Sequence, residues 1–155
     1  MAIFARPGVR PRGYALVIAL IAVVIASLAA SLVIQNAQTK ARRERETQLL
    51  WAGLQIRDAL ASYKSASPQG APNLPLRLED LVEDKRFPVP RRHLRQIYPD
   101  PMTGKQDWEL IRLGERIVGV HSRSTERPLK KGNFPPGAGD FSSAGSYADW
   151  RFVVQ

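Results

Sequence analysis

Few side chains in this 155-residue chain could do chemistry. It has no cysteine, which excludes disulfides and thiolate metal sites, and its only two histidines are His93 and His121. A hydrolase needs a base, a nucleophile and an orienting carboxylate brought together. The sequence holds no nucleophile elbow, zinc-ligand spacing or phosphate-binding loop. We therefore expect no enzyme, and we interpret both histidines as surface or strand-packing residues.

The charged residues form clusters without a binding motif. Four acids stand at a predicted short helix over residues 78–84, where carboxylates suit the positive end of the helix dipole: Glu79, Asp80, Glu83 and Asp84. The basic pairs at 91–92 and 130–131 lack the interleaved aromatic residues of a nucleic-acid groove. We interpret them as solvated surface, and we expect no nucleic-acid partner despite a net charge of +9.

The element that organises the chain is an uncharged, mainly apolar stretch over residues 14–34. About 21 helical residues, at about 1.5 Å each, span the roughly 30 Å core of a bilayer. A removable signal peptide has a shorter apolar region, of about 7–15 residues, and ends at a small-x-small site. Ser27-Leu28-Ala29 would be a poor site of that kind, and a signal peptide stays as an alternative.

The residues on either side of this stretch do not decide its orientation. Three arginines precede it, and four basic residues follow it: Lys40, Arg42, Arg43 and Arg45. We place the short tail in the cytoplasm because the folded part must be the long C-terminal portion. The sequence therefore predicts a single-pass membrane protein.

The start of the chain resembles that of type IV pilins and type II secretion pseudopilins. Residues 12–16 read Arg-Gly-Tyr-Ala-Leu and lead into the apolar stretch, and residues 30–36 continue the similarity in register. The resemblance implies that residues 1–13 are a leader, removed by a prepilin peptidase between Gly13 and Tyr14, and that the new N-terminus is methylated. Two residues depart from the family pattern, because Ile18 replaces a glutamate and Gln35 replaces a proline.

The helical pattern continues beyond the apolar stretch to about residue 64. Small residues in the stretch form a stripe suited to close helix packing, and a high alanine content alone explains them equally well: Ala15, Ala19, Ala22 and Ala26. In residues 35–64 one face is apolar, through Leu49, Ala52, Ile56, Leu60 and Tyr63, and residues 43–46 form a solvated face. We thus expect a transmembrane helix over 14–34 and an amphipathic helical spine over 35–64.

Residues 65–155 are predicted to form a globular domain that covers this spine. Residues 107–113 and 117–122 read as strands joined by a tight hairpin, residues 123–146 as a loop, and residues 147–154 as a last strand. A long helix followed by a three-stranded antiparallel sheet is an α+β fold. Residues 98–108, with Tyr-Pro-Asp-Pro-x-Thr-Gly-Lys, resemble the globular part of a major pseudopilin.

The resemblance implies a structural subunit of a periplasmic pseudopilus in type II secretion or a related assembly. It implies as partners like subunits in a helical fibre, other pseudopilins, inner-membrane platform proteins, the prepilin peptidase and membrane lipid. It also implies a bacterial inner-membrane location with the C-terminal domain in the periplasm. Major pseudopilins often bind calcium before the last strand, where Asp140 and Asp149 are weak candidate ligands. The alternative is a single-pass membrane-anchored periplasmic module that binds or transforms an unknown ligand.

Overall fold

The computed structural model describes residues 12–71 and 73–154, with the backbone alone at residues 12–13 and 31–34. Residues 1–11 of the expected leader lie outside the described residues. The chain divides into two units, residues 1–40 and residues 41–155. Six elements follow one another along the chain, and the first, α1, begins in one unit and ends in the other.

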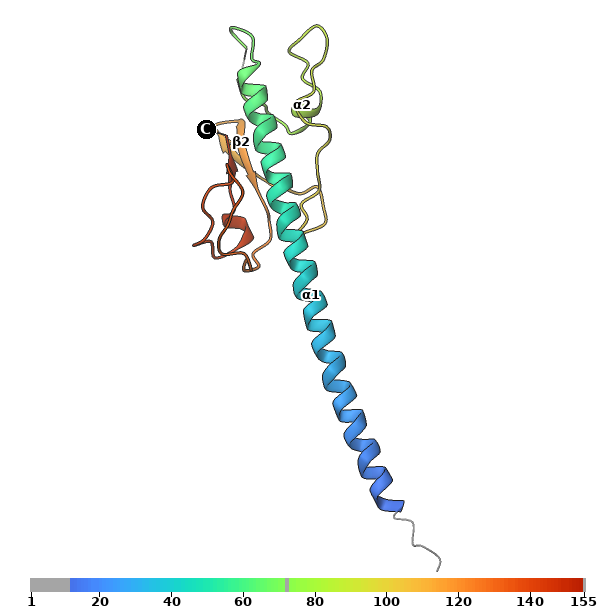
Figure 1. Cartoon of the computed structure of the whole chain (residues 1–155). Helices are drawn as coiled ribbons and strands as arrows, with labels where there is room; N and C mark the ends of the chain where they lie inside the picture. The colour runs from blue at the N-terminus through green and yellow to red at the C-terminus, as the bar shows by residue number, and fades with distance from the viewer. Residues whose placement is uncertain (1–11, 72, 155) are drawn as a thin grey trace, which may run out of the picture. The chain divides into compact units, whose positions relative to one another are not determined.

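The described part of the first unit is helical. Helix α1 (Arg12–Ser65) is 54 residues long and continues without interruption through Ser27 and Gln35 (Figure 1). Every described side chain from Tyr14 to Ala30 is exposed, although most are apolar. Among the described residues, α1 is the one helix long and apolar enough to cross a membrane. A single membrane-spanning segment is therefore supported, as the sequence predicts.

The second unit has its core along α1. The expected apolar face is confirmed, because Leu49, Ala52, Ile56, Leu60 and Tyr63 are all buried. Residues from the sheet and from the later loops pack on this face to form one hydrophobic core. Figure 1 shows β2 and the short helix α2 (Glu79–Val82) on different sides of this part of α1.

The sheet has three antiparallel strands in the order β1-β2-β3, and the α+β fold is confirmed. Strands β1 (Glu109–Leu113) and β2 (Arg116–His121) form the expected hairpin, whose turn places Gly114 at a φ of 62°. That left-handed conformation favours glycine. Strand β3 (Phe152–Val153) is shorter than expected.

The segment before β3 corrects the expectation of one strand over residues 147–154. A 3-10 helix, η1 (Tyr147–Asp149), occupies its first part. Ser146 and Asp149 form a capping box, in which each side chain accepts a backbone N–H of the other residue. Capping stabilises a helical turn at this point, so the chain cannot continue as a strand until Phe152.

Gly53 lets α1 approach the sheet. A Cβ atom added at Gly53 would lie 2.3 Å from two ring carbons of Phe152 in β3. Real Cβ atoms do not come that close to other heavy atoms, so any larger residue here must displace the ring. A glycine within a helix costs only about 1 kcal/mol relative to alanine, and at Gly53 the close contact with Phe152 gives it a packing role.

The loop over residues 123–146 holds no helix or strand, as expected, but it contributes to the core. Ala138, Phe141 and Ala144 are buried. The ring of Phe141 is stacked on that of Trp150, with a centroid distance of 5.5 Å and an interplanar angle of 13°. The loop therefore forms part of the hydrophobic core together with the helix and the sheet.

Candidate functional site

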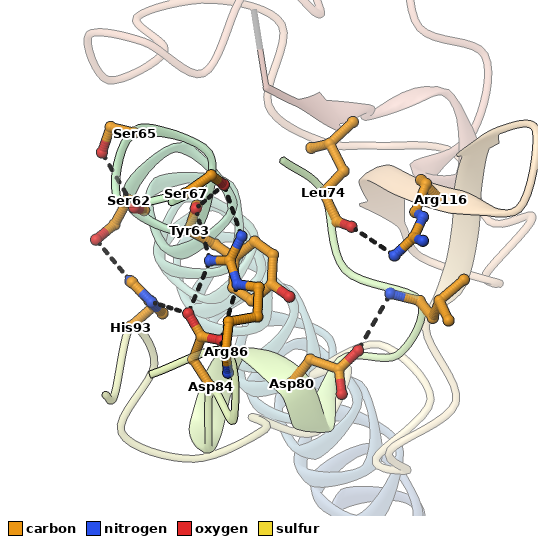
Figure 2. Close-up of polar contacts among 11 residues, drawn as sticks. Ser62, Tyr63, Ser65, Ser67, Leu74, Asp80, Asp84, Arg86, His93 and Arg116 are labelled. Atoms are coloured by element: carbon orange, nitrogen blue, oxygen red, sulfur yellow. Dashed lines mark hydrogen bonds and ion pairs between the residues drawn. The ribbon is translucent and has the colours of Figure 1, made fainter. Parts of the chain in front are cut away.

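A polar cluster fastens the end of α1 to the loop that follows α2. It consists of Ser62, Asp84, Arg86 and His93, and we call it the terminal cluster (Figure 2). Asp84 is held in place by its own backbone, because its N–H donates to the Arg91 carbonyl at 2.8 Å and its carbonyl accepts from the Arg91 N–H. Residues 84–91 thus form a closed loop that presents the Asp84 carboxylate to α1.

Arg86 joins this carboxylate to the helix end. Its Nε donates to Asp84 Oδ1 at 2.9 Å and its Nη2 to Asp84 Oδ2 at 2.7 Å. The same guanidinium donates to the Tyr63 carbonyl at 3.0 Å and to Ser67 Oγ at 2.6 Å. It also lies 3.4 Å from the centroid of the Tyr63 ring. A cation here satisfies a carbonyl in the last turn of α1, where the helix dipole favours positive charge.

His93 lies between the carboxylate and a hydroxyl. Its Nε2 is 3.1 Å from Asp84 Oδ2, and its Nδ1 is 2.8 Å from Ser62 Oγ. The imidazole is 4 % exposed, so the interpretation of His93 as a surface or strand-packing residue is wrong. The three groups come from separate segments of the chain, and no spacing in the sequence joins them.

The order Ser62–His93–Asp84 is that of a hydrolase triad, so its chemistry must be judged from its surroundings. Both Asp84 oxygens already accept from Arg86, which limits what the carboxylate can add to a protonated imidazole. Ser62 lies within α1, and its carbonyl accepts from the Ala66 N–H at 3.0 Å. Backbone N–H groups there are used by the helix and cannot face an oxyanion. The geometry supports a structural clasp better than an acyl-transfer site.

The ionisation of the cluster agrees with a permanent ion pair. Burial acts to raise the pKa of Asp84, but hydrogen bonds from Arg86 and His93 outweigh it and lower the pKa from 3.8 to about 2. The hydrogen bond to Asp84 raises the pKa of Arg86. Burial also raises the pKa of Tyr63. Asp84 and Arg86 are therefore both charged at neutral pH.

A second polar cluster lies earlier on α1, at Glu46. This residue is 2 % exposed, and the expectation that it belongs to a solvated face is wrong. Its Oε1 accepts from the Leu129 N–H at 2.6 Å, the Lys130 N–H at 3.1 Å and the Tyr147 hydroxyl at 2.9 Å. Burial raises the pKa of Tyr147. One carboxylate thereby docks the loop near residue 130 and helix η1 on α1.

Arg42 adds to the same docking. Its guanidinium donates to the Arg127 carbonyl at 2.7 Å and lies 3.1 Å from the Glu126 carboxylate. Its Nε also donates to the Tyr147 hydroxyl at 3.3 Å, and this hydrogen bond raises the pKa of Arg42. The loop at residues 126–130 is therefore fixed to the first turns of α1 in this unit.

The residues predicted for processing and helix packing lie in the first unit. Tyr14 and the alanine stripe are exposed on α1: Ala15, Ala19, Ala22 and Ala26. Gly13 is helical in its backbone. Cleavage at Gly13 and packing through the stripe stay predictions.

The calcium candidates Asp140 and Asp149 line one hollow of about 370 Å³. Asp149 Oδ2 accepts from two backbone N–H groups and the Ser146 hydroxyl, and Asp140 Oδ1 accepts from the Ser142 N–H. Backbone hydrogen bonds are the main cause of the lowered pKa of each carboxyl. Lys131 Nζ donates to the Ala144 carbonyl at 3.2 Å, which places a cation beside the hollow.

These residues are a poor fit for calcium, which takes six to eight oxygens. Both carboxylates serve as caps for their own turns, and a lysine uses one of the nearby carbonyls. Within residues 12–71 and 73–154, no group of three or more histidine, cysteine or acidic side chains could hold a metal ion. Calcium binding stays a prediction from the resemblance.

No family model, no curated protein and no solved structure matches this chain.

Proposed function

We propose that this chain is a pseudopilin-like subunit that is stored in a membrane through its N-terminal helix and assembles with like subunits into a periplasmic fibre. The observation that carries the proposal is α1 itself. One uninterrupted helix is apolar and exposed in its first part and supplies the spine of an α+β core in its second part.

The exposed apolar part of α1 needs a covering. Leu16, Leu20, Ile21 and Ile25 each expose more than half of their surface, as do most of their apolar neighbours. So much contiguous apolar surface is not stable in water. Lipid covers it in a membrane, and the helices of other subunits cover it in a fibre, so a subunit that moves between the two uses the same surface twice.

The resemblance at residues 12–16 supports this assignment over a generic membrane anchor. A basic leader, a glycine and an aromatic residue precede the apolar helix in the pattern that prepilin peptidases cleave. Ile18 stands where the family has a glutamate. Carboxylates are costly in lipid, so this subunit inserts more easily and relies on packing instead of charge for its register in the fibre.

N-terminal sequencing of the membrane-extracted protein tests the proposal. With a prepilin peptidase co-expressed, we expect the mature chain to begin at Tyr14. Gly13→Val should block cleavage, whereas Gly8→Val, a matched change within the leader, should permit it. A mature end at Ala30 or Ser31 would identify an ordinary signal peptide and overturn the proposal.

The second candidate function is an anchored enzymatic module, and the Ser62–His93–Asp84 order is the observation that favours it. A fluorophosphonate probe, which reacts with activated serines, separates the two. We expect the probe not to label Ser62, so the wild type and Ser62→Ala should give the same labelling. Labelling of Ser62 that depends on His93 would favour the enzyme.

A further inference from the structure

We infer that the second unit carries a basic surface that binds anionic phospholipid headgroups beside the membrane-spanning segment; this inference rests on the proposed membrane anchoring. The surface consists of five cations, which we call the basic collar: Arg42, Arg43, Arg127, Lys130 and Lys131. Two of them come from α1, and three come from a loop more than eighty positions later.

The fold brings these two groups together. Glu46 binds the N–H groups of Leu129 and Lys130, and Arg42 binds the carbonyl of Arg127. A hollow of about 300 Å³ results, lined in part by Arg43, Lys130 and Lys131. The collar thus depends on the packing of the loop on α1, because the helix alone supplies two of its five cations.

The collar keeps an excess of positive charge. Three acids stand near these cations in the sequence: Glu44, which is exposed, Glu46, which is buried under backbone donors, and Glu126, which pairs with Arg42. In the described part of the chain, Arg43, Arg127, Lys130 and Lys131 form no salt bridge. Leu129 lies among them with 38 % of its surface exposed, which provides an apolar contact at a lipid interface.

The short distance in sequence between the apolar stretch and the collar favours lipid headgroups as the ligand. Arg42 follows the end of the apolar stretch, Ile34, by eight residues, and eight helical residues span roughly 12 Å. The headgroup layer adds about 5–8 Å on each side of the hydrocarbon core. Helical side chains lean toward the N-terminus, and long basic side chains reach back to place their charge at the interface. Clustered cations at this distance are attracted by anionic lipid.

Because the chain has no cysteine, one introduced cysteine can be labelled specifically. Gly132→Cys gives a single labelling site in the hollow, where an added Cβ meets nothing within 4 Å. The full chain, labelled there with a donor fluorophore, is reconstituted into nanodiscs with an acceptor on a lipid headgroup. One set of discs is phosphatidylcholine alone, and the other contains about 30 % phosphatidylglycerol, an amount that gives a clearly negative surface.

We expect energy transfer at least about twofold higher in the anionic discs, and we expect 1 M salt to abolish the difference, because screening then acts within about 3 Å. The triple variant Arg43→Gln, Lys130→Gln, Lys131→Gln should lose the preference. Its matched control removes three exposed cations elsewhere, as Arg91→Gln, Arg92→Gln, Arg95→Gln, and should keep it.

Equal transfer in the two kinds of disc would overturn the inference. This comparison does not use the triple variants, so it does not depend on their folding. An equal loss in the control triple would also overturn it, because net charge and not the collar would then be responsible. A salt effect of the same size in both discs would point to an acidic protein surface instead. If the chain does not enter discs at all, the membrane anchoring itself fails, which is a distinguishable result.

Discussion

The two parts of α1 share one helical backbone and differ in what covers them. Every described side chain over residues 14–30 is exposed, whereas over residues 49–63 one apolar stripe is buried by the rest of the chain. The polar contacts differ in the same way. Ser27 and Thr39 donate to carbonyls one turn earlier in the helix, while Glu46 and Ser62 bond to residues far along the chain.

Helix formation alone therefore says little about how a segment is used. The buried part is stabilised within one molecule, so substitutions there should change its folding. In the proposed function, lipid or other subunits cover the exposed part, so substitutions there should change insertion or assembly.

The largest effect is expected from the same truncation made in each part. Leu60→Ala removes a fully buried side chain from the core and should lower the free energy of unfolding by about 2–5 kcal/mol. Leu20→Ala removes an exposed side chain from the apolar part and should leave unfolding of the globular unit unchanged. Denaturant unfolding of the full chain in non-ionic detergent, followed by tryptophan fluorescence, measures both. Equal destabilisation by the two substitutions would show that both parts of α1 contribute alike to folding.

Gly53 gives the next largest effect. Helix propensity alone predicts that Gly53→Ala stabilises α1 by about 1 kcal/mol. Because the new methyl group would meet the Phe152 ring, we expect destabilisation by about 1–3 kcal/mol instead. Gly132→Ala, where the added atom meets open space, is the control and should be close to neutral. A higher melting temperature for Gly53→Ala would show that Phe152 moves aside at little cost.

Acid should weaken the terminal cluster at the end of α1. The pKa of Asp84 in the folded protein, about 2, lies below its ordinary value of 3.8. The ionised carboxylate therefore stabilises the fold above about pH 4, and about 2 kcal/mol is lost as the pH falls toward 2. Unfolding free energies measured in this range should fall more steeply for the wild type than for Asp84→Asn. Parallel curves would show that Asp84 does not cause the loss of stability in acid.

The smallest effect on folding is expected in the alanine stripe. Ala22→Leu adds bulk where neighbouring helices are predicted to approach closely, and it should reduce cross-linking between subunits in membranes without reducing insertion. Val24→Leu, on the opposite side of the helix, is the control. If both variants cross-link equally well, the stripe reflects composition and not an interface.

The repeating features of the chain were predictable from its sequence. The apolar face of α1, its end at Ser65 and the hairpin at residues 113–116 follow from periodicity and turn chemistry. Helix η1 could have been read from Ser146 and Asp149, which stand three residues apart as a capping box requires.

The polar clusters were not predictable in this way. Glu46 looks like one of several charged helix residues, and its hydrogen-bond partners Leu129, Lys130 and Tyr147 all come more than eighty positions later. His93 stands among basic residues in the sequence but contacts Ser62 and Asp84 in the fold. Such contacts depend on how distant segments pack, and local pattern carries no information about that packing.

The contact between Gly53 and Phe152 also sets a timetable for biogenesis. These residues stand about one hundred positions apart, and a ribosome adding about 5–20 residues per second needs roughly 5–20 seconds to pass from one to the other. During that interval the apolar stripe of α1 has been made and its covering strand has not. The time for which the nascent helix is open to aggregation is therefore set by the pace of translation and not by the stability of the finished fold. Synonymous codons that slow translation between residues 66 and 147 should raise losses during synthesis while leaving the mature protein unchanged.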